Sequence, residues 1–165
     1  MANVATGKQR FKLALLNPIA TTGVWAYQLA ANILSFHKVA AATVSVISVC
    51  VPYDERGGLQ ADGMLSAISY DYTVATANQT GAPTPVLRKL TKNAATGVTT
   101  SAVVTTTTAF TGTNTVGSAI GTYNCILTVA TPAALGDEES LILEITQNEA
   151  ATTVLDIFGV TATYA

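Results

Sequence analysis

The sequence contains little charge. Only 11% of its 165 residues are Asp, Glu, Lys or Arg, whereas soluble domains typically carry about 25%. The hydrophobic fraction of 49% nevertheless excludes intrinsic disorder, which requires low hydrophobicity together with high net charge. The net charge is −2 and the basic residues are scattered, so no concentrated basic face is available and nucleic acid is not expected as a partner. A surface so poor in charge is suited to permanent burial against neighbouring subunits.

Residues that carry chemistry are equally scarce. His37 is the only histidine, which excludes a histidine pair for a metal and leaves a Ser–His–acid set without a recognisable spacing. The acidic residues fall in short clusters without the spacing of an EF-hand. We therefore predict that the chain is not an enzyme and that it has no catalytic residue, no cofactor and no metal site.

Cysteines and long apolar runs are also few. Cys50 and Cys125 stand in alternating apolar runs without a C-x-x-C spacing. Buried free thiols are predicted for both, because free cysteine behaves as a small hydrophobe, and a disulfide is the alternative if their strands pair. The run Leu13–Leu16 is shorter than the core of a signal peptide, which needs about 7–15 residues. No run approaches the about 20 residues of a membrane span, so no membrane is expected as a partner.

The sequence has instead a strong alternation of apolar and polar residues with a period of two, which is typical of half-buried strands. The clearest runs are residues 43–52, 64–76, 84–92, 121–131, 140–147 and 152–164. The more apolar face of each run is expected to be buried. The predicted core residues are Ile68, Tyr72, Val74, Leu127, Val129, Leu143, Ile145 and Phe158.

One stretch, AVVTTTTAFTGTNTVGS at residues 102–118, has no charge at all, and the charge-free region extends from Asn93 to Gly136. Threonine favours strands because its β-branch packs well on a pleated surface. A mucin-like stalk would interleave prolines with its threonines, and this stretch has none. We predict that AVVTTTTAF is one strand with a solvent-exposed or partner-covered threonine face, and that TGTNTVGS forms its turn.

The order of these elements predicts the fold class. Eight or so strands separated by turns, without alternating helices, indicate an all-β protein with a single antiparallel β-sandwich. Trp25 precedes both cysteines, which differs from the immunoglobulin order and favours a jelly roll. Residues 24–36 fit an amphipathic helix nearly as well as two short strands. We divide the chain into an N-terminal arm for attachment, residues 1–36, and a β-sandwich domain, residues 37–165.

Three segments in about the C-terminal two-thirds of the chain resemble a known class of protein, and the chain opens with a lysine-bearing arm like that class. The three segments are residues 64–90, 123–135 and 137–164, of which ESLILEIT followed by AATTVLDIFGVTATY is the most specific part. These segments resemble small β-sandwich structural proteins of tailed-bacteriophage and uncultivated-virus virions, of the head-decoration or fibre type. The resemblance implies no catalytic or ligand residues, and it does not cover residues 2–36.

The composition and the resemblance together predict a virion structural protein. We expect a capsid or capsid-decorating subunit, located in the virion, that packs against copies of itself and against other capsid proteins. An extracellular or cell-surface subunit of a filament or other assembly is the first alternative. A carbohydrate-binding module with Trp25 as a sugar platform is the second.

The expected partner is the chain itself, as a trimer or larger ring, because the resembled virion proteins commonly form trimers. Residues 24–36 are apolar enough that a monomer would expose a patch of the kind that marks an interaction site. The interface candidates are Trp25, Tyr27, Ile33, Leu34 and Phe36.

Overall fold

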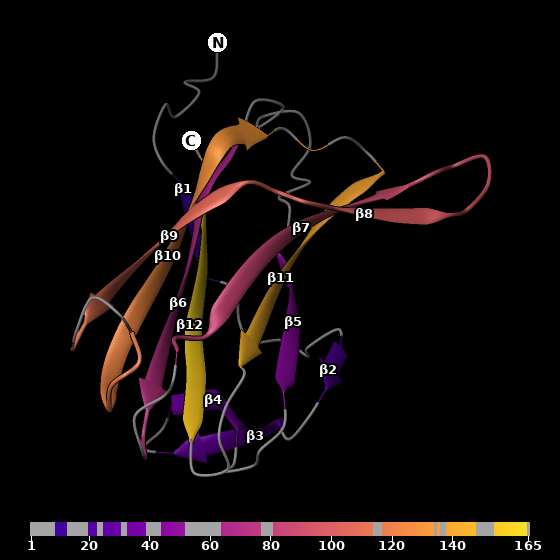
Figure 1. The fold of residues 1–165 in the computed structure, drawn as a ribbon. Coiled ribbons are helices and arrows are strands. Elements are labelled where there is room, and N and C mark those ends of the chain that lie inside the picture. Colours follow the sequence, from indigo (N-terminus) through magenta and orange to yellow (C-terminus); the bar gives the residue numbers. More distant parts are fainter. Residues whose placement is uncertain are drawn as a thin grey trace.

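The protein is an all-β sandwich of two antiparallel sheets, as predicted (Figure 1). The computed structural model describes residues 9–12, 20–22, 25–30, 33–38, 44–51, 64–76, 81–113, 117–133, 135, 138–147 and 154–164. No helix in this part of the chain is long and apolar enough to cross a membrane.

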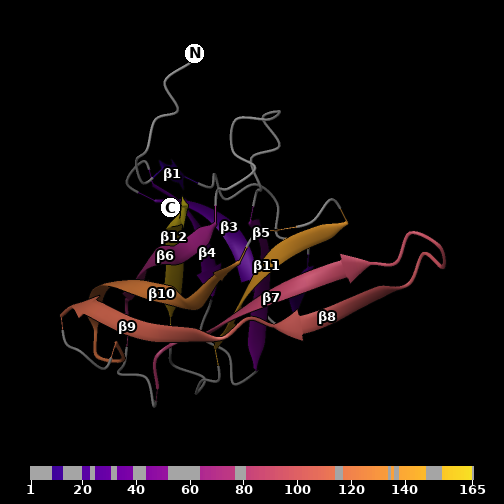
Figure 2. The same cartoon turned by 90° about the horizontal axis from the view of Figure 1, so that it is seen from above.

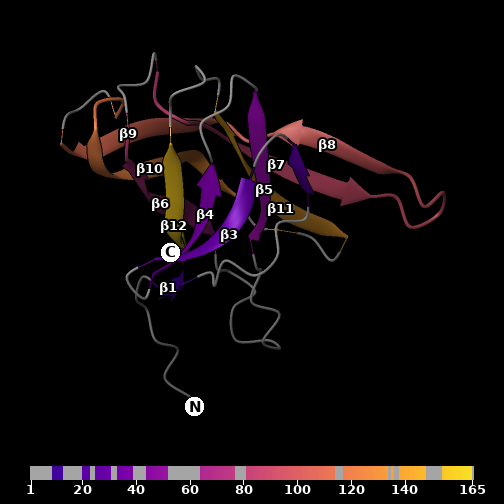
Figure 3. The same cartoon turned by 90° about the horizontal axis from the view of Figure 1, so that it is seen from below.

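The first sheet has seven strands. Along its main path it contains, in order of pairing, β3 (Trp25–Ala30), β4 (Ile33–Lys38), β12 (Leu155–Tyr164), β6 (Leu65–Val74), β10 (Gly121–Ala133) and β9 (Thr106–Gly112). The seventh strand, β1 (Gln9–Lys12), pairs with residues 161–164 of β12. Figure 3 shows β12, β4 and β3 in this order from below.

The second sheet has five strands. They are, in order of pairing, β2 (Ala20–Thr22), β5 (Ser45–Val51), β11 (Glu139–Gln147), β7 (Thr84–Lys92) and β8 (Thr99–Val103). The hairpin of β7 and β8 extends beyond the rest of the sandwich (Figure 1). Its turn is closed by Asn93, whose side chain accepts hydrogen bonds from the backbone N–H groups of Ala95 and Thr96 at 3.0 and 3.1 Å. Gly97 supplies the positive φ of 71° that this turn requires.

The N-terminal strands belong to both sheets. Residues 25–30 and 33–38 form the two short strands β3 and β4 rather than a helix, and β4 pairs with β12. β1 pairs with β12 and β2 pairs with β5. The boundary expected at residue 36 therefore falls inside β4, and the described strands before it are hydrogen-bonded members of the sandwich.

The core lies between the two sheets and follows the predicted alternation. Of the predicted core residues, Ile68, Tyr72, Val74, Leu127, Val129, Leu143 and Ile145 are buried. Three tyrosines dominate the core beside β10: the Tyr72 ring stacks on Tyr123 at a centroid distance of 5.0 Å and lies 5.8 Å from Tyr70. The Tyr72 and Tyr123 hydroxyls donate to the carbonyls of Gly117 and Ala119. These contacts satisfy polar atoms that burial would otherwise leave unpaired.

The prediction for Phe158 is wrong, because a β-bulge interrupts the alternation in β12. The pairing with β6 shifts between Phe158 and Thr161, where Gly159 adopts a φ of 65°. Ile157 points inward before the bulge and Val160 points inward after it, whereas Phe158 is only half-buried. A bulge adds one residue to a strand and so reverses the parity of every residue beyond it.

The predicted burial is also wrong for one of the two cysteines. Both thiols are free, but Cys50 is exposed and only Cys125 is buried. Cys50 lies on β5 of the five-stranded sheet, whereas Cys125 lies on β10 of the other sheet. Their strands do not pair, so the condition for a disulfide within the chain is not met.

Candidate assembly interface

The threonine-rich stretch forms the edge of both sheets. One strand was expected for residues 102–110, but β8 ends at Val103 and β9 begins at Thr106. β8 is the last strand of the five-stranded sheet, and β9 is the last strand of the seven-stranded sheet. Figure 2 shows the two strands running end to end along one rim of the sandwich. The chain changes sheets at Val104 and Thr105, which explains why one continuous β-branched run gives two strands.

The backbone hydrogen bonds at this crossing reveal which groups point outward. Val104 donates its N–H to Leu87 in β7, and Ala130 in β10 donates to Thr105. Directly opposed residues of an antiparallel pair alternately bond to each other through their backbone groups and direct those groups away from each other. The backbone N–H and C=O groups therefore point to the neighbouring strand at even positions of β8 and at odd positions of β9. The backbone groups directed to the open edge are those of Thr99, Ser101, Val103, Thr106, Thr108, Phe110 and Gly112.

Among the described residues, this edge has few of the features that normally protect a strand edge. Native proteins protect such edges with charges, proline, bulges, short strands or a covering segment. β8 and β9 contain no charged residue and no proline, and no strand in the described part of the chain pairs with their outer side. By contrast, β2 at the opposite edge of the five-stranded sheet has three residues. In the described part of the chain, the rim of β8 and β9 is therefore an uncharged edge with unpaired backbone groups.

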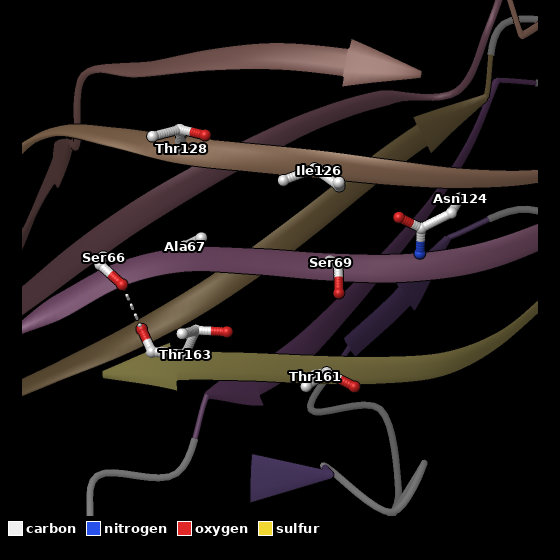
Figure 4. Close-up of a pocket in the computed structure, with 8 residues that line it drawn as sticks. All are labelled: Ser66, Ala67, Ser69, Asn124, Ile126, Thr128, Thr161 and Thr163. Atoms are coloured by element: carbon white, nitrogen blue, oxygen red, sulfur yellow. Dashed lines mark hydrogen bonds between the residues drawn. The ribbon is translucent and has the colours of Figure 1, made fainter. Parts of the chain in front are cut away.

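The outer face of the seven-stranded sheet adjoins this rim and is mainly polar, and the carboxylates of Asp71 and Asp156 lie on it. A shallow concavity of about 450 Å³ lies over β6, β10 and β12, lined mainly by small hydroxyl-bearing side chains (Figure 4). Ser66 donates its hydroxyl to the carbonyl of Thr163 at 3.1 Å, which holds β6 against β12. Ile126 is the largest apolar residue in the concavity. Hydroxyl groups lose little on desolvation when a partner supplies hydrogen bonds, so this face is suited to flat packing.

Two ion pairs brace β7 against β11, at the base of the projecting hairpin. Arg88 donates from Nε to the Glu144 carboxylate, and the Lys89 Nζ lies 2.6 Å from Glu139 Oε1. Glu139 also accepts a hydrogen bond from the Thr91 hydroxyl. All four charged side chains are partly exposed, at 18–35%, so each pair contributes about 1 kcal/mol or less to stability. They link side chains of two strands that are already paired through their backbones.

The side chain of His37 takes part in a hydrogen-bonded group that does not have the geometry of a catalytic triad. Its Nδ1 lies 2.9 Å from Asp156 Oδ1, and Ser35 donates its hydroxyl to the same oxygen. A nucleophilic serine must instead donate to the far nitrogen of the histidine. Among the described residues there is also no group of three metal-ligating side chains. The thiol of Cys125 is not activated either, because burial raises its pKa to about 11.

The predicted interface residues are not all on one exposed surface. Phe36 is in the core, 2% exposed. Trp25 is half-buried and packs against that core, with its indole Nε1 lacking a hydrogen-bond partner among the described atoms. The side chains of Tyr27, Ile33 and Leu34 lie outside the described part of the structure. Leu29, which was not predicted, is 71% exposed in β3.

Comparison with known proteins finds no matching family model and no matching curated protein. Among solved structures, an arabinose-bound α-L-arabinofuranosidase is similar over 94% of this chain and 23% of its own length, at 9% identity and a TM-score of 0.37. A likeness at this level supports no assignment of activity.

Proposed function

We propose that the protein is a virion structural subunit, a capsid or capsid-decorating protein that self-associates as a trimer or larger ring and packs on a viral shell. The carrying observation is the rim of β8 and β9, which combines an open hydrogen-bonding edge with the absence of charge. Such an edge is an aggregation hazard for a free monomer. It becomes useful in a protein whose edge is covered in an assembly.

The strand order supports the jelly-roll assignment within this proposal. Eight strands fall into two rows, β4-β12-β6-β10 and β5-β11-β7-β8, an order compatible with two Greek keys shared between two sheets. Jelly rolls occur in viral capsids and also in lectin domains. The step from this fold to a virion is therefore an analogy at the level of the fold, and the uncharged rim is what favours assembly over ligand binding.

The experiment is to purify the particles of the virus that encodes this chain and to count its copies by quantitative mass spectrometry. We expect many copies in a constant ratio to the other shell proteins. Absence of the chain from the particles would contradict the proposal. Its recovery from cell-surface filaments instead would establish the alternative role as a filament subunit.

A further inference from the structure

We propose that β9 pairs in antiparallel orientation with β9 of a second copy, joining two seven-stranded sheets across a two-fold axis. This inference deepens the proposed function, on which it rests, by naming the partner of the rim. A strand added to an exposed sheet edge gains affinity from main-chain hydrogen bonds. In β9 the backbone groups available for this are those of Thr106, Thr108, Phe110 and Gly112.

The length of β9 defines a register in which the strand overlaps itself completely. Antiparallel pairing of Thr106–Gly112 with its own copy places Ala109 opposite Ala109 at the two-fold axis. In this register Thr106 meets Gly112 and Thr108 meets Phe110 of the other copy, and all four have outward-pointing backbone groups. The pairing would form about eight backbone hydrogen bonds, two for each of the four pairs whose backbone groups point outward.

The side chains are compatible with this register on both faces. On the outer face Thr107 meets Thr111 of the other copy on either side of the central alanines, and cross-strand threonine pairs are favourable. On the inner face Phe110 meets Thr108, which gives the half-buried ring a β-branched neighbour. Thr108 and Ala109 are both exposed in the single chain, so no buried group has to be uncovered.

The distribution of charge favours a second copy as the occupant. Two identical edges bring identical charges together, and like charges opposite each other destabilise strand pairs. β9 and its neighbour β10 contain no charged residue, so self-pairing meets no repulsion at this edge. The β8 edge differs, because its neighbour β7 carries Arg88, Lys89 and Lys92. An acidic or basic peptide would find no complementary charge along β9.

Two variants with opposite charges at Ala109 test the pairing in the full chain. At the two-fold axis opposed Cβ atoms lie about 4.5–5.5 Å apart, so Ala109→Lys places two lysines together and Ala109→Glu places two carboxylates together. By light scattering at micromolar concentration, we expect each variant to have half the wild-type mass or less. Mixing the two variants should restore the wild-type mass with both chains in equal amounts, and high salt should weaken the mixed assembly.

Two further variants control for folding and for the hydrogen bonds. Ala109→Gln has a long side chain without charge and should keep the wild-type mass. Thr108→Pro removes an outward-pointing N–H at a sheet edge, where proline is tolerated within the chain, and should lower the mass, whereas Thr108→Val should not. A cooperative unfolding transition identifies the variants that remain folded, and its midpoint is expected to fall where association is lost.

Several outcomes would overturn the proposal. They are a wild-type protein with the 17.0 kDa mass of one chain, charged variants that keep the wild-type mass, and a mixture that fails to reassemble. The result is separate from the test of the virion role. If particles contain many copies of the chain but its charged variants still assemble, the virion role would stand and the edge pairing would be contradicted. If the two charged variants assemble only when they are mixed but the chain is absent from particles, the edge pairing would stand and the virion role would be contradicted.

Discussion

At the scale of single residues, the two thiols differ because their side chains point to opposite sides of their sheets. Cys125 points inward from β10 and lies beside Tyr70, its partner in β6. Cys50 stands in an equally apolar run but points outward from β5. A reactive cysteine needs exposure and a thiolate, and Cys125 lacks both because burial excludes reagents and raises its pKa to about 11.

Alkylation should therefore distinguish the two thiols. We expect iodoacetamide at pH 8 to label one cysteine in the folded protein and both in denaturant, as counted by intact mass. Cys50→Ala is the matched control and should leave the folded protein unlabelled. Rapid labelling of Cys125 in that folded variant would show that the β10 core is open to solvent.

At the scale of elements, the bulge in β12 decides which side chains fill one end of the core. The left-handed φ of Gly159 is favourable for glycine and unfavourable for residues with a Cβ. A Cβ at this position would also run into the Asp71 carboxylate. The same carboxylate accepts a hydrogen bond from the Asn124 side chain at 2.7 Å, so the surroundings of the bulge are already held in place.

Gly159→Ala should thus lower the free energy of unfolding by about 1–3 kcal/mol, the range for a strained backbone position. Urea denaturation gives the measurement. Gly81→Ala is the control, because a Cβ at Gly81 would meet no atom within 4 Å, and it should change stability by no more than about 0.5 kcal/mol. Equal effects of the two substitutions would mean that the bulge conformation is not required.

At the scale of the whole molecule, the N-terminal strands close the first sheet at the edge opposite β9. β3 is the last strand on that side and presents Leu29 to solvent. An exposed leucine at a sheet edge is a candidate contact for a trimer or larger ring that does not involve β9. A subunit with contacts at both edges could link rings through two-fold axes, since closed symmetry is the usual result of self-association.

Leu29→Glu should weaken this second contact without unfolding the chain. Burial of a leucine contributes about 1.5–3 kcal/mol, so the association constant should fall by about tenfold or more in sedimentation equilibrium. Gln28→Glu adds the same charge to the neighbouring exposed position on the opposite face of β3 and should leave association unchanged. An equal loss in both variants would indicate a general effect of charge rather than a contact of Leu29.

The sequence by itself determined the class of fold and most of the core, because side chains on a strand alternate faces with a period of two. The inward positions of β6, β10 and β11 could be read directly from that alternation. It also determined that the rim would be uncharged. Both properties depend on local patterns that remain the same whichever strands become neighbours.

Only the tertiary structure decided where those patterns are interrupted and what lies beside them. Phe158 faces away from the core because of the bulge at Gly159, and Val104 and Thr105 divide one β-branched run between two sheets. Cys50 is exposed although its run is as apolar as that of Cys125. In each case the position depends on hydrogen bonds to strands distant in sequence. The open edge of β9 is likewise a property of strand order, which no local pattern specifies.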